Sequence, residues 1–337
     1  LNQGLDLGRK LTLISAPAGF GKTTLVSEWF AGLPEPVEGV WITLDEGDND
    51  PVRFLAYIIA ALNRASGSDI TVGKGALDML KAPQPPSATA ILTTLINDTT
   101  AVPGRIVLTL DDYHVIESAV VDASTSVDAL TSIDGVLAFL IEHLPPNLHL
   151  VIATRDDPLL PLARLRARGQ LTEIRALDLR FSATEAAEFL NQVMRLTLSA
   201  EDIAALEART EGWIAGLQLA ALSMRDRANP AQFIAHLSGS HRHILRYLTE
   251  EVLSQQPAEI QNFLLQTSIL DELSGDLCDA VTGGINGGLL LEQLFDDNLF
   301  LIPLDDEQNW YRYHQLFADL LRDRQKAMYK EETADLH

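Results

Sequence analysis

The stretch of this sequence that most constrains the fold is a glycine-rich turn that follows an apolar run. The run Leu11–Ser15 is rich in β-forming residues, and a helix is predicted over 23–31. Glycines between a strand and a helix let successive backbone N–H groups converge on phosphate oxygens, so this order is typical of a phosphate-binding loop. The alternative is an ordinary glycine turn, and Ala16 stands where such loops usually have their first glycine. The turn reads Ala16-Pro17-Ala18-Gly19-Phe20-Gly21-Lys22-Thr23-Thr24.

The residues of the turn have predicted roles in binding ATP or ADP with Mg²⁺. Lys22 would place its charge at the β- and γ-phosphates, and the hydroxyl of Thr23 would bind the metal ion. The helix that follows adds the positive end of its dipole. The predicted nucleotide-binding residues of the turn are Ala18, Gly19, Phe20, Gly21, Lys22, Thr23 and Thr24.

Two further apolar runs end in polar residues that suit the same chemistry. The run over 105–110 ends in Asp111 and Asp112, and we predict that Asp111 holds Mg²⁺ while Asp112 orients or deprotonates the attacking water. Strand-end capping is the alternative for these carboxylates. The run over 148–153 leads into Arg155, which would contact the γ-phosphate if its strand neighbours the first one. A surface ion pair with a following aspartate is the alternative for Arg155.

Composition limits the partners and the compartment. Lys and Arg number 25 against 47 Asp and Glu, and the resulting net charge of −22 disfavours contact with DNA or an anionic membrane. The single cysteine, Cys278, excludes an intrachain disulfide and is expected in the core. We find no run long enough to cross a bilayer and no cleavable signal, and we expect a cytoplasmic protein. The chain does not begin with Met, so we expect a fragment.

The 337 residues predict more than one domain. Near-continuous apolar runs separated by helices predict a parallel five-stranded sheet with helices on both faces, which is an α/β P-loop NTPase core over 1–179. The pattern then becomes almost purely helical over 180–255, with capped starts at Ser182 and Ser199. Two short strands joined by the polar turn 305–309 predict a winged-helix domain over 256–337. Loops are expected over 67–86 and 121–132.

Two weaker candidates remain open. The acidic run 45–50 either approaches the metal or is a solvated loop that caps the next helix. His314, at the start of the last helix, either hydrogen-bonds a nucleotide phosphate from a distant domain or packs as a half-buried side chain on Tyr313 or Phe317.

Longer stretches resemble one family. SAPAGFGKTTLVSEW, WITLDEGDNDPVRFLAYIIAAL, LDDYHVI, HLPPNLHLVIATRDDPLLPLARLRARGQLTEIRALDLRF, TEGWIAGLQLAAL and WYRYHQLFADLLR are similar to the MalT-type large ATP-binding transcription activators of LuxR type, which are signal-transduction ATPases with numerous domains. The resemblance implies a nucleotide-binding core, a helical domain and a winged-helix domain. It also implies that a sensor for an inducer and a helix-turn-helix DNA reader lie outside this chain.

The resemblance also assigns residues. It places Gly19, Gly21, Lys22, Thr23 and Thr24 on the phosphates, Asp111 and Asp112 at the acidic strand end, Arg155 as a sensor and His314 on the ADP phosphates. In the wider class a Gly-x-Pro motif contacts adenine, whereas this chain has Gly212-Trp213-Ile214 without the proline.

The function implied by the resemblance is an ATP/ADP switch that self-associates with ATP and resets by slow hydrolysis. A turnover ATPase, such as a motor or repair enzyme, and a scaffold that binds no nucleotide are the alternatives.

Overall fold

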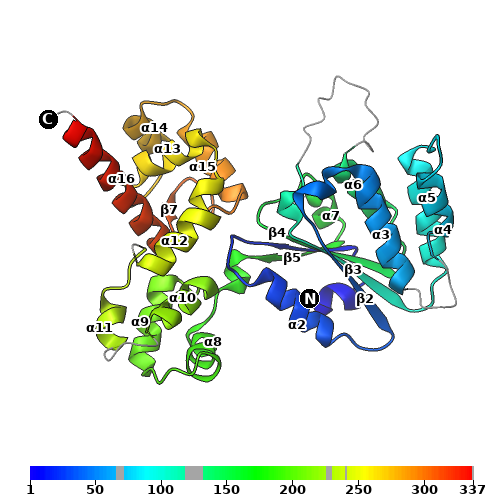
Figure 1. Ribbon diagram of the computed structural model, residues 1–337, viewed down its shortest axis with the longest axis horizontal. Coiled ribbons are helices and arrows are strands. Elements are labelled where there is room, and N and C mark those ends of the chain that lie inside the picture. The colour runs from blue at the N-terminus through cyan, green and yellow to red at the C-terminus, as the bar shows by residue number, and fades with distance from the viewer. Residues whose placement is uncertain (66–71, 118–131, 225–229, 240, 336–337) are drawn as a thin grey trace. The chain divides into compact units, whose positions relative to one another are not determined.

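The computed structural model describes residues 1–65, 72–117, 132–224, 230–239 and 241–335 (Figure 1). The chain forms two compact units. The first unit comprises Leu1–Ala16 and Lys22–Arg175, and the second comprises Pro17–Gly21 and Ala176–His337. The tip of the glycine-rich turn is therefore part of the second unit by its contacts.

A five-stranded parallel sheet forms the centre of the first unit, as predicted. The strand order is β2-β3-β4-β1-β5, so β2 and β5 lie at the edges. Every residue of β1 and β4 is buried, because a parallel sheet covered on both faces needs apolar side chains on both sides of each inner strand. The strands are β1 (Leu11–Ser15), β2 (Val37–Thr43), β3 (Arg105–Asp111), β4 (Leu148–Thr154) and β5 (Leu171–Arg175).

Helices cover both faces of this sheet, which confirms the predicted fold class. Figure 1 shows α2 on one face and α3 with α6 on the opposite face, an arrangement that follows from right-handed crossovers between parallel strands. The oxygen of Asp50 accepts from the backbone N–H of Val52 at 2.8 Å and so caps α3, with Pro51 as its first residue. The helices are α1 (Asn2–Asp6), α2 (Lys22–Ala31), α3 (Pro51–Ala65), α4 (Lys74–Leu80), α5 (Ala88–Thr100), α6 (Ile133–Glu142) and α7 (Leu162–Ala167).

The loop predicted over 67–86 is wrong in part, since α4 lies within it and packs on α5. Its apolar residues Ala76 and Leu80 are buried against the core, and this burial outweighs the short, glycine-containing sequence. Residues 67–71 of that loop and residues 121–131 of the second predicted loop lie outside the described residues. Ser132, at the end of the second loop, caps α6.

The second unit begins with a helical region, as the change of pattern indicates. Ser182 and Glu185 form the predicted capping box at α8, and the hydroxyl of Ser199 caps α9. The helix α8 continues as a π-helical segment, Glu188–Val193. The helices are α8 (Ala183–Ala187), α9 (Ala200–Thr210), α10 (Ile214–Met224), α11 (Pro230–Ala235) and α12 (Arg242–Glu251).

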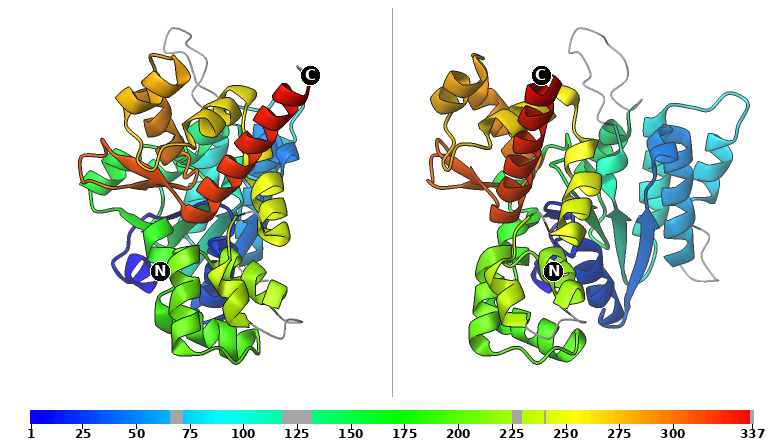
Figure 2. Two further views of the ribbon diagram at one scale, coloured as in Figure 1. Left: turned by 90° about the vertical axis from the view of Figure 1, so that its left-hand side faces the viewer. Right: turned by 60° about the vertical axis from the view of Figure 1, so that its left-hand side comes forward.

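The rest of the second unit combines helices with a short antiparallel hairpin. β6 and β7 pair with Leu301 opposite Tyr313, as the polar turn between them predicts. Figure 2 shows the long helix α16, which contacts α12 and α13. Cys278 is buried within α14, in agreement with a core role. The elements are α13 (Ala258–Thr267), α14 (Gly275–Thr282), α15 (Gly287–Asp296), β6 (Leu301–Pro303), β7 (Tyr311–Tyr313) and α16 (Gln315–Asp335).

Across the described ranges, we find no helix with the length and apolar character that a membrane span requires.

Candidate functional site

The glycine-rich turn has the backbone that its sequence predicts. Gly19 and Gly21 have φ angles of 77° and 76°, in the left-handed region that favours glycine. Lys22 begins α2, and its Nζ donates a hydrogen bond to the carbonyl of Ala16 at 2.7 Å. Thr24 is exposed in the first turn of the same helix. The turn thus presents backbone N–H groups, an ammonium and a helix N-terminus along one short segment.

The structure brings Thr23 and Asp111 together although 88 residues separate them in sequence. The Thr23 hydroxyl donates to Oδ1 of Asp111 at 3.2 Å. The Asp111 side chain is buried at the carboxyl end of β3, and the same oxygen accepts the backbone N–H of Asp112 at 3.1 Å. Asp112 has a φ of 57°, and its side chain is 44% exposed. One carboxylate is therefore positioned beside the threonine and the other is open to solvent.

Thr23 and Asp111 fit Mg²⁺ as part of its ligand set, but they do not form a complete site. A hydroxyl and a carboxylate oxygen are the hard ligands that Mg²⁺ prefers, and it usually completes its shell with water and phosphate oxygens. Within the described ranges, no three His, Cys, Asp or Glu side chains gather into a site that holds a metal by themselves. The ion would therefore be shared between Thr23, Asp111 and a bound phosphate.

The charged groups of the turn shift one another's ionisation. Burial, together with the nearby charge of Arg155, lowers the pKa of Lys22 to about 8, although both aspartates oppose the shift. Burial and the neighbouring charge of Asp112 raise the pKa of Asp111, against the hydrogen bond from Thr23. A bound phosphate with a cation would relieve both penalties, because it supplies the missing opposite charges.

Arg155 follows the strand that neighbours β1, which was the condition of its prediction. Ser15 pairs with Thr154, so Arg155 lies at the level of the turn. Asp157, one of the two aspartates of the alternative, forms an ion pair with Arg175. Asp156 retains an electrostatic interaction with Arg155 and accepts a hydrogen bond from the Thr154 hydroxyl at 3.1 Å.

His114 is a member of this cluster to which the sequence analysis gave no role. Its Nδ1 lies 3.8 Å from Oδ1 of Asp112. Burial, then the charge of Arg155, lowers the pKa of His114 to about 4, so the ring is neutral at pH 7. A histidine two residues after paired carboxylates at a strand end was the available signal, since the short turn Tyr113–Val115 folds it back toward them.

The tip of the turn is held by the N-terminus of α10. The indole Nε1 of Trp213 donates to the carbonyl of Ala18 at 3.1 Å, and the backbone N–H of Ala215 donates to the carbonyl of Gly19 at 3.1 Å. A Cβ on Gly19 would lie 2.6 Å from the Cβ of Ala215. The side chains of Ala18 and Phe20 are buried, so these two residues offer a ligand only their backbone groups. The stretch around Trp213 thus contacts the turn directly.

His314 occupies a closed position within the second unit. Its Nε2 donates to the carbonyl of Thr210 at 2.9 Å, and its Nδ1 is buried without a hydrogen-bond partner. Burial lowers the pKa of His314, and the neutral ring then carries its proton on Nε2. The side chain is 2% exposed, so it is fully rather than half buried, and its ring packs against Trp213 and Phe300.

The acidic run 45–50 stabilises its own segment. Asp45 and Asp48 form a capping box around the 3-10 turn Glu46–Asn49, and both pair with Arg53 of α3. These contacts favour the alternative in which the run is a structural cap.

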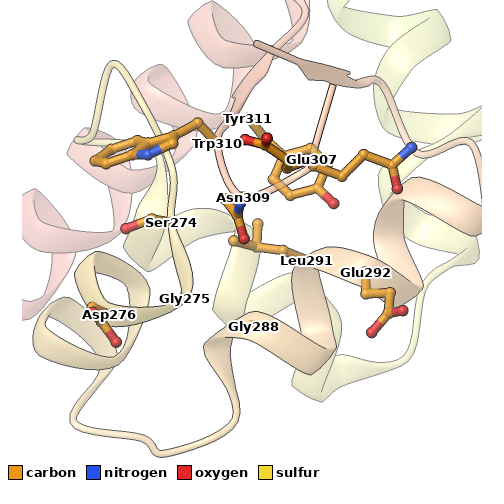
Figure 3. Close-up of a pocket in the computed structure, with 11 residues that line it drawn as sticks. Ser274, Gly275, Asp276, Gly288, Leu291, Glu292, Glu307, Asn309, Trp310 and Tyr311 are labelled. Atoms are coloured by element: carbon orange, nitrogen blue, oxygen red, sulfur yellow. The ribbon is translucent and has the colours of Figure 1, made fainter. Parts of the chain in front are cut away.

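The second unit also contains a cavity of about 540 Å³ beside the hairpin (Figure 3). Asp276, Glu292 and Glu307 line it, and none of its lining residues is Lys, Arg or His. An acidic lining of this kind does not suit a phosphate. The lining residues are Ser274, Gly275, Asp276, Gly288, Leu291, Glu292, Glu307, Gln308, Asn309, Trp310 and Tyr311.

Comparison with known proteins connects these features to one family. Residues 249–333 match the model of the MalT winged helix domain. The chain is 36% identical over 330 residues to the HTH-type transcriptional regulator MalT of Klebsiella pneumoniae (strain 342), covering 97% of this chain. The chain is MalT-like. It covers 35% of the length of that regulator.

Two other similarities concern proteins that are not MalT regulators. The MalT-like chain is 34% identical over 330 residues to the serine/threonine-protein kinase PknK of Mycobacterium tuberculosis (strain ATCC 25618 / H37Rv), covering 98% of this chain and 28% of the kinase. The Walker-type ATPase of Pyrococcus abyssi is similar in structure, with a TM-score of 0.59 at 15% identity, over 95% of this chain and 94% of that one. The first likeness indicates a module shared by proteins of different activity, and the second supports the P-loop ATPase fold.

Proposed function

We propose that this MalT-like chain is an ATP/ADP-binding switch module of a bacterial transcriptional regulator. The observation that carries the proposal is the Thr23–Asp111 hydrogen bond of 3.2 Å beside a turn with two left-handed glycines. The phosphate loop and the acidic strand end are separate segments of the chain. They meet at Thr23, the residue expected to bind Mg²⁺, and folding alone does not require this contact. Proteins related to MalT provide the regulatory context.

Each residue of the cluster has a part in this proposal. Backbone N–H groups of Gly19 and Gly21 bind phosphate oxygens, and Lys22 leaves the carbonyl of Ala16 for the β- and γ-phosphates. Thr23 and Asp111 hold the Mg²⁺ that neutralises the phosphates when nucleotide is bound.

Hydrolysis would depend on the groups around the second carboxylate. Asp112 accepts a proton from the attacking water, which its solvent-exposed side chain can reach. Arg155 contacts the γ-phosphate and so distinguishes ATP from ADP. Neutral His114 would position the Asp112 carboxylate if its Nδ1, now 3.8 Å from Oδ1 of Asp112 and without a hydrogen-bond partner, moved close enough to donate a hydrogen bond. We expect ATP hydrolysis to be slow, because in a switch it sets how long the ATP-bound state lasts.

The switch would connect nucleotide state to assembly. We propose three domains, over 1–179, 180–255 and 256–337, with His314 tying the winged helix to bound ADP. Because Nε2 is engaged by Thr210, His314 would reach a phosphate only through Nδ1, which requires the charged ring. ATP would release this contact and permit self-association, whereas the inducer and DNA bind other parts of the longer protein.

The test is direct titration of the chain with MgADP and MgATP, together with single-turnover hydrolysis. We expect both nucleotides to bind and hydrolysis to take minutes or longer. Asp112→Asn keeps binding and lowers the hydrolysis rate about 100-fold, as expected for loss of a general base. Asp78→Asn, at an exposed position of α4, is the matched control and leaves both unchanged.

Two outcomes would contradict the proposal. Steady-state rates of many turnovers per second by the wild-type chain would favour a turnover ATPase. Absence of nucleotide binding, with Lys22→Ala indistinguishable from wild type, would favour an interaction scaffold.

A further inference from the structure

Trp213 is the residue that connects the turn to the rest of the second unit. Its side chain is completely buried, and its indole donates to the carbonyl of Ala18 at 3.1 Å. These two residues are 195 positions apart. The next loop carbonyl, that of Gly19, accepts the backbone N–H of Ala215 at 3.1 Å. Two successive carbonyls of the turn are thereby held by one short segment.

Holding a carbonyl also orients an N–H group. In a planar trans peptide the C=O of one residue and the N–H of the next point in opposite directions. The bond from Trp213 to the Ala18 carbonyl therefore sets the direction of the Gly19 N–H, and Ala215 does the same for the Phe20 N–H. These N–H groups are the ones that a phosphate loop turns toward its ligand.

The orientation of Trp213 depends in turn on the hairpin region. Its ring packs edge-on against Phe300, with centroids 5.2 Å apart, and against His314 at 5.9 Å. Phe300 has a φ of 53°, a strained conformation for a bulky residue, and its carbonyl accepts the backbone N–H of His314 at 2.8 Å. Phe300 also packs against Phe20 of the turn itself, at 6.2 Å.

Residues of the hairpin region also hydrogen-bond the segment that precedes Trp213. Arg312 makes two hydrogen bonds of 2.8 and 2.9 Å with the carboxylate of Glu211. The carbonyl of Thr210 accepts both His314 Nε2 and the backbone N–H of Trp213, each at 2.9 Å. A shift of the hairpin would thus reach Trp213 through its ring and through its backbone.

We propose that Trp213 is a positioning residue for the phosphate loop, which orients the Gly19 N–H and makes this orientation depend on the contact of the Arg312–His314 segment with Thr210 and Glu211. The inference rests on the proposed nucleotide-binding function. It assigns to the Gly212-Trp213-Ile214 stretch a role in shaping the loop.

The test compares two substitutions of the same kind. Trp213→Phe keeps an aromatic ring and removes the donor to Ala18, whereas Trp310→Phe changes a tryptophan of the hairpin turn that is 41% exposed. We expect Trp213→Phe to raise the dissociation constant for MgADP about tenfold, the effect of losing one buried hydrogen bond. Trp310→Phe should change it less than twofold. Urea unfolding and circular dichroism establish that each variant is folded.

Arg312→Gln supplies the readout that a purely structural tryptophan would not affect. It alters no residue of the loop, and we expect it to weaken MgADP binding about threefold. In the Arg312→Gln background, Trp213→Phe should raise the dissociation constant only about threefold instead of tenfold, because the backbone before Trp213 has already lost the contact between Arg312 and Glu211. Equal effects of Trp213→Phe in both backgrounds would overturn the coupling. If Trp213→Phe does not fold, unchanged MgADP affinity of Arg312→Gln overturns it alone.

Different results would overturn the proposed nucleotide binding and the role of Trp213. A wild-type chain that binds no nucleotide overturns the proposed function and this inference together. A wild-type chain that binds MgADP, with a folded Trp213→Phe variant of equal affinity, overturns only the role of Trp213.

Discussion

The carboxylate of Glu211 offers a stringent test of what holds the hairpin region to the helices of the second unit. It accepts two hydrogen bonds from Arg312 and a third from the backbone N–H of Gln315 at 2.9 Å. Its side chain is 10% exposed, and the side chain of Arg312 is 36% exposed. Glu211→Gln keeps the shape of the side chain and removes its charge.

The loss in the free energy of unfolding expected for Glu211→Gln follows from these contacts. A hydrogen bond to a charged group contributes roughly 1.5–3 kcal/mol, and leaving a buried charge unpaired costs more. Glutamine still accepts one bond, and water reaches the part-exposed Arg312, so the net loss should be about 2 kcal/mol. For a unit of this size, about 2 kcal/mol lowers the Tm by roughly 4–8 °C.

The pH dependence has a definite sign. Burial is the largest influence and raises the pKa of Glu211, but the hydrogen bonds from Arg312, the charge of His314 and the backbone N–H of Gln315 together outweigh it, so the pKa lies below its ordinary value. A carboxyl group with a lowered pKa in the folded state stabilises the fold above its unfolded pKa, and this contribution is lost as the pH falls. The difference between wild type and Glu211→Gln should therefore shrink in acid.

The assay is urea unfolding followed by tryptophan fluorescence at pH 7 and pH 4. Glu250→Gln is the matched control, because Glu250 pairs with Arg246 at 2.9 Å on an exposed helix face and should lose less than about 0.5 kcal/mol. The double variant with Arg312→Gln should lose less than the sum of the single losses. Equal losses for Glu211→Gln and Glu250→Gln, or strict additivity with Arg312→Gln, would refute the reasoning.

Three further outcomes follow from the groups of the first unit. Because phosphate raises the lowered pKa of Lys22 from about 8, nucleotide binding should take up a proton near pH 8, and affinity should fall between pH 7 and 9 by calorimetry in buffers of different ionisation enthalpy. Hydrogen bonds from Arg166, then from Arg175, lower the pKa of Glu173 to about 2 against the effect of burial; Glu173→Gln should therefore make unfolding less sensitive to pH below about 4.5, and the wild type should lose more stability than the variant as the pH falls. Asp111→Asn should raise the Tm of the nucleotide-free chain, because it removes a buried carboxylate whose pKa is raised, while abolishing the effect of Mg²⁺ on nucleotide affinity. An unchanged or lower Tm for Asp111→Asn would contradict this account.

The sheet was predictable because its signals are local. Each inner strand is an apolar run bounded by turn residues, and β1 matches its predicted bounds. The edge strand β2 has a weaker signal, because its residues are mostly part-exposed. The helix α4 was missed because it is short and depends on packing against α5 for its stability.

The candidate site also has parts that the sequence predicts and parts that it does not. Gly19, Gly21, Lys22 and Thr23 form one continuous motif, so spacing alone predicted their arrangement. The neutral state of His114 arises from burial near Arg155, and no pattern in the sequence reports burial of a loop histidine. The assignment of His314 to a phosphate remains a prediction, since the structure engages its Nε2 with Thr210.

The sequence by itself determined that a strand, a glycine-rich turn and a helix would follow one another, because backbone conformation and helix initiation depend on neighbouring residues. It also determined the family, through motifs spread along the chain. Only the tertiary structure decided that Asp111 lies within 3.2 Å of Thr23 and that Trp213 holds the Ala18 carbonyl. The motifs predicted that Thr23 and Asp111 share an ion, but not their distance, and nothing local predicted the contact of Trp213. Contacts across 88 and 195 residues arise from strand order and helix packing, which minimise exposed apolar surface over the whole unit.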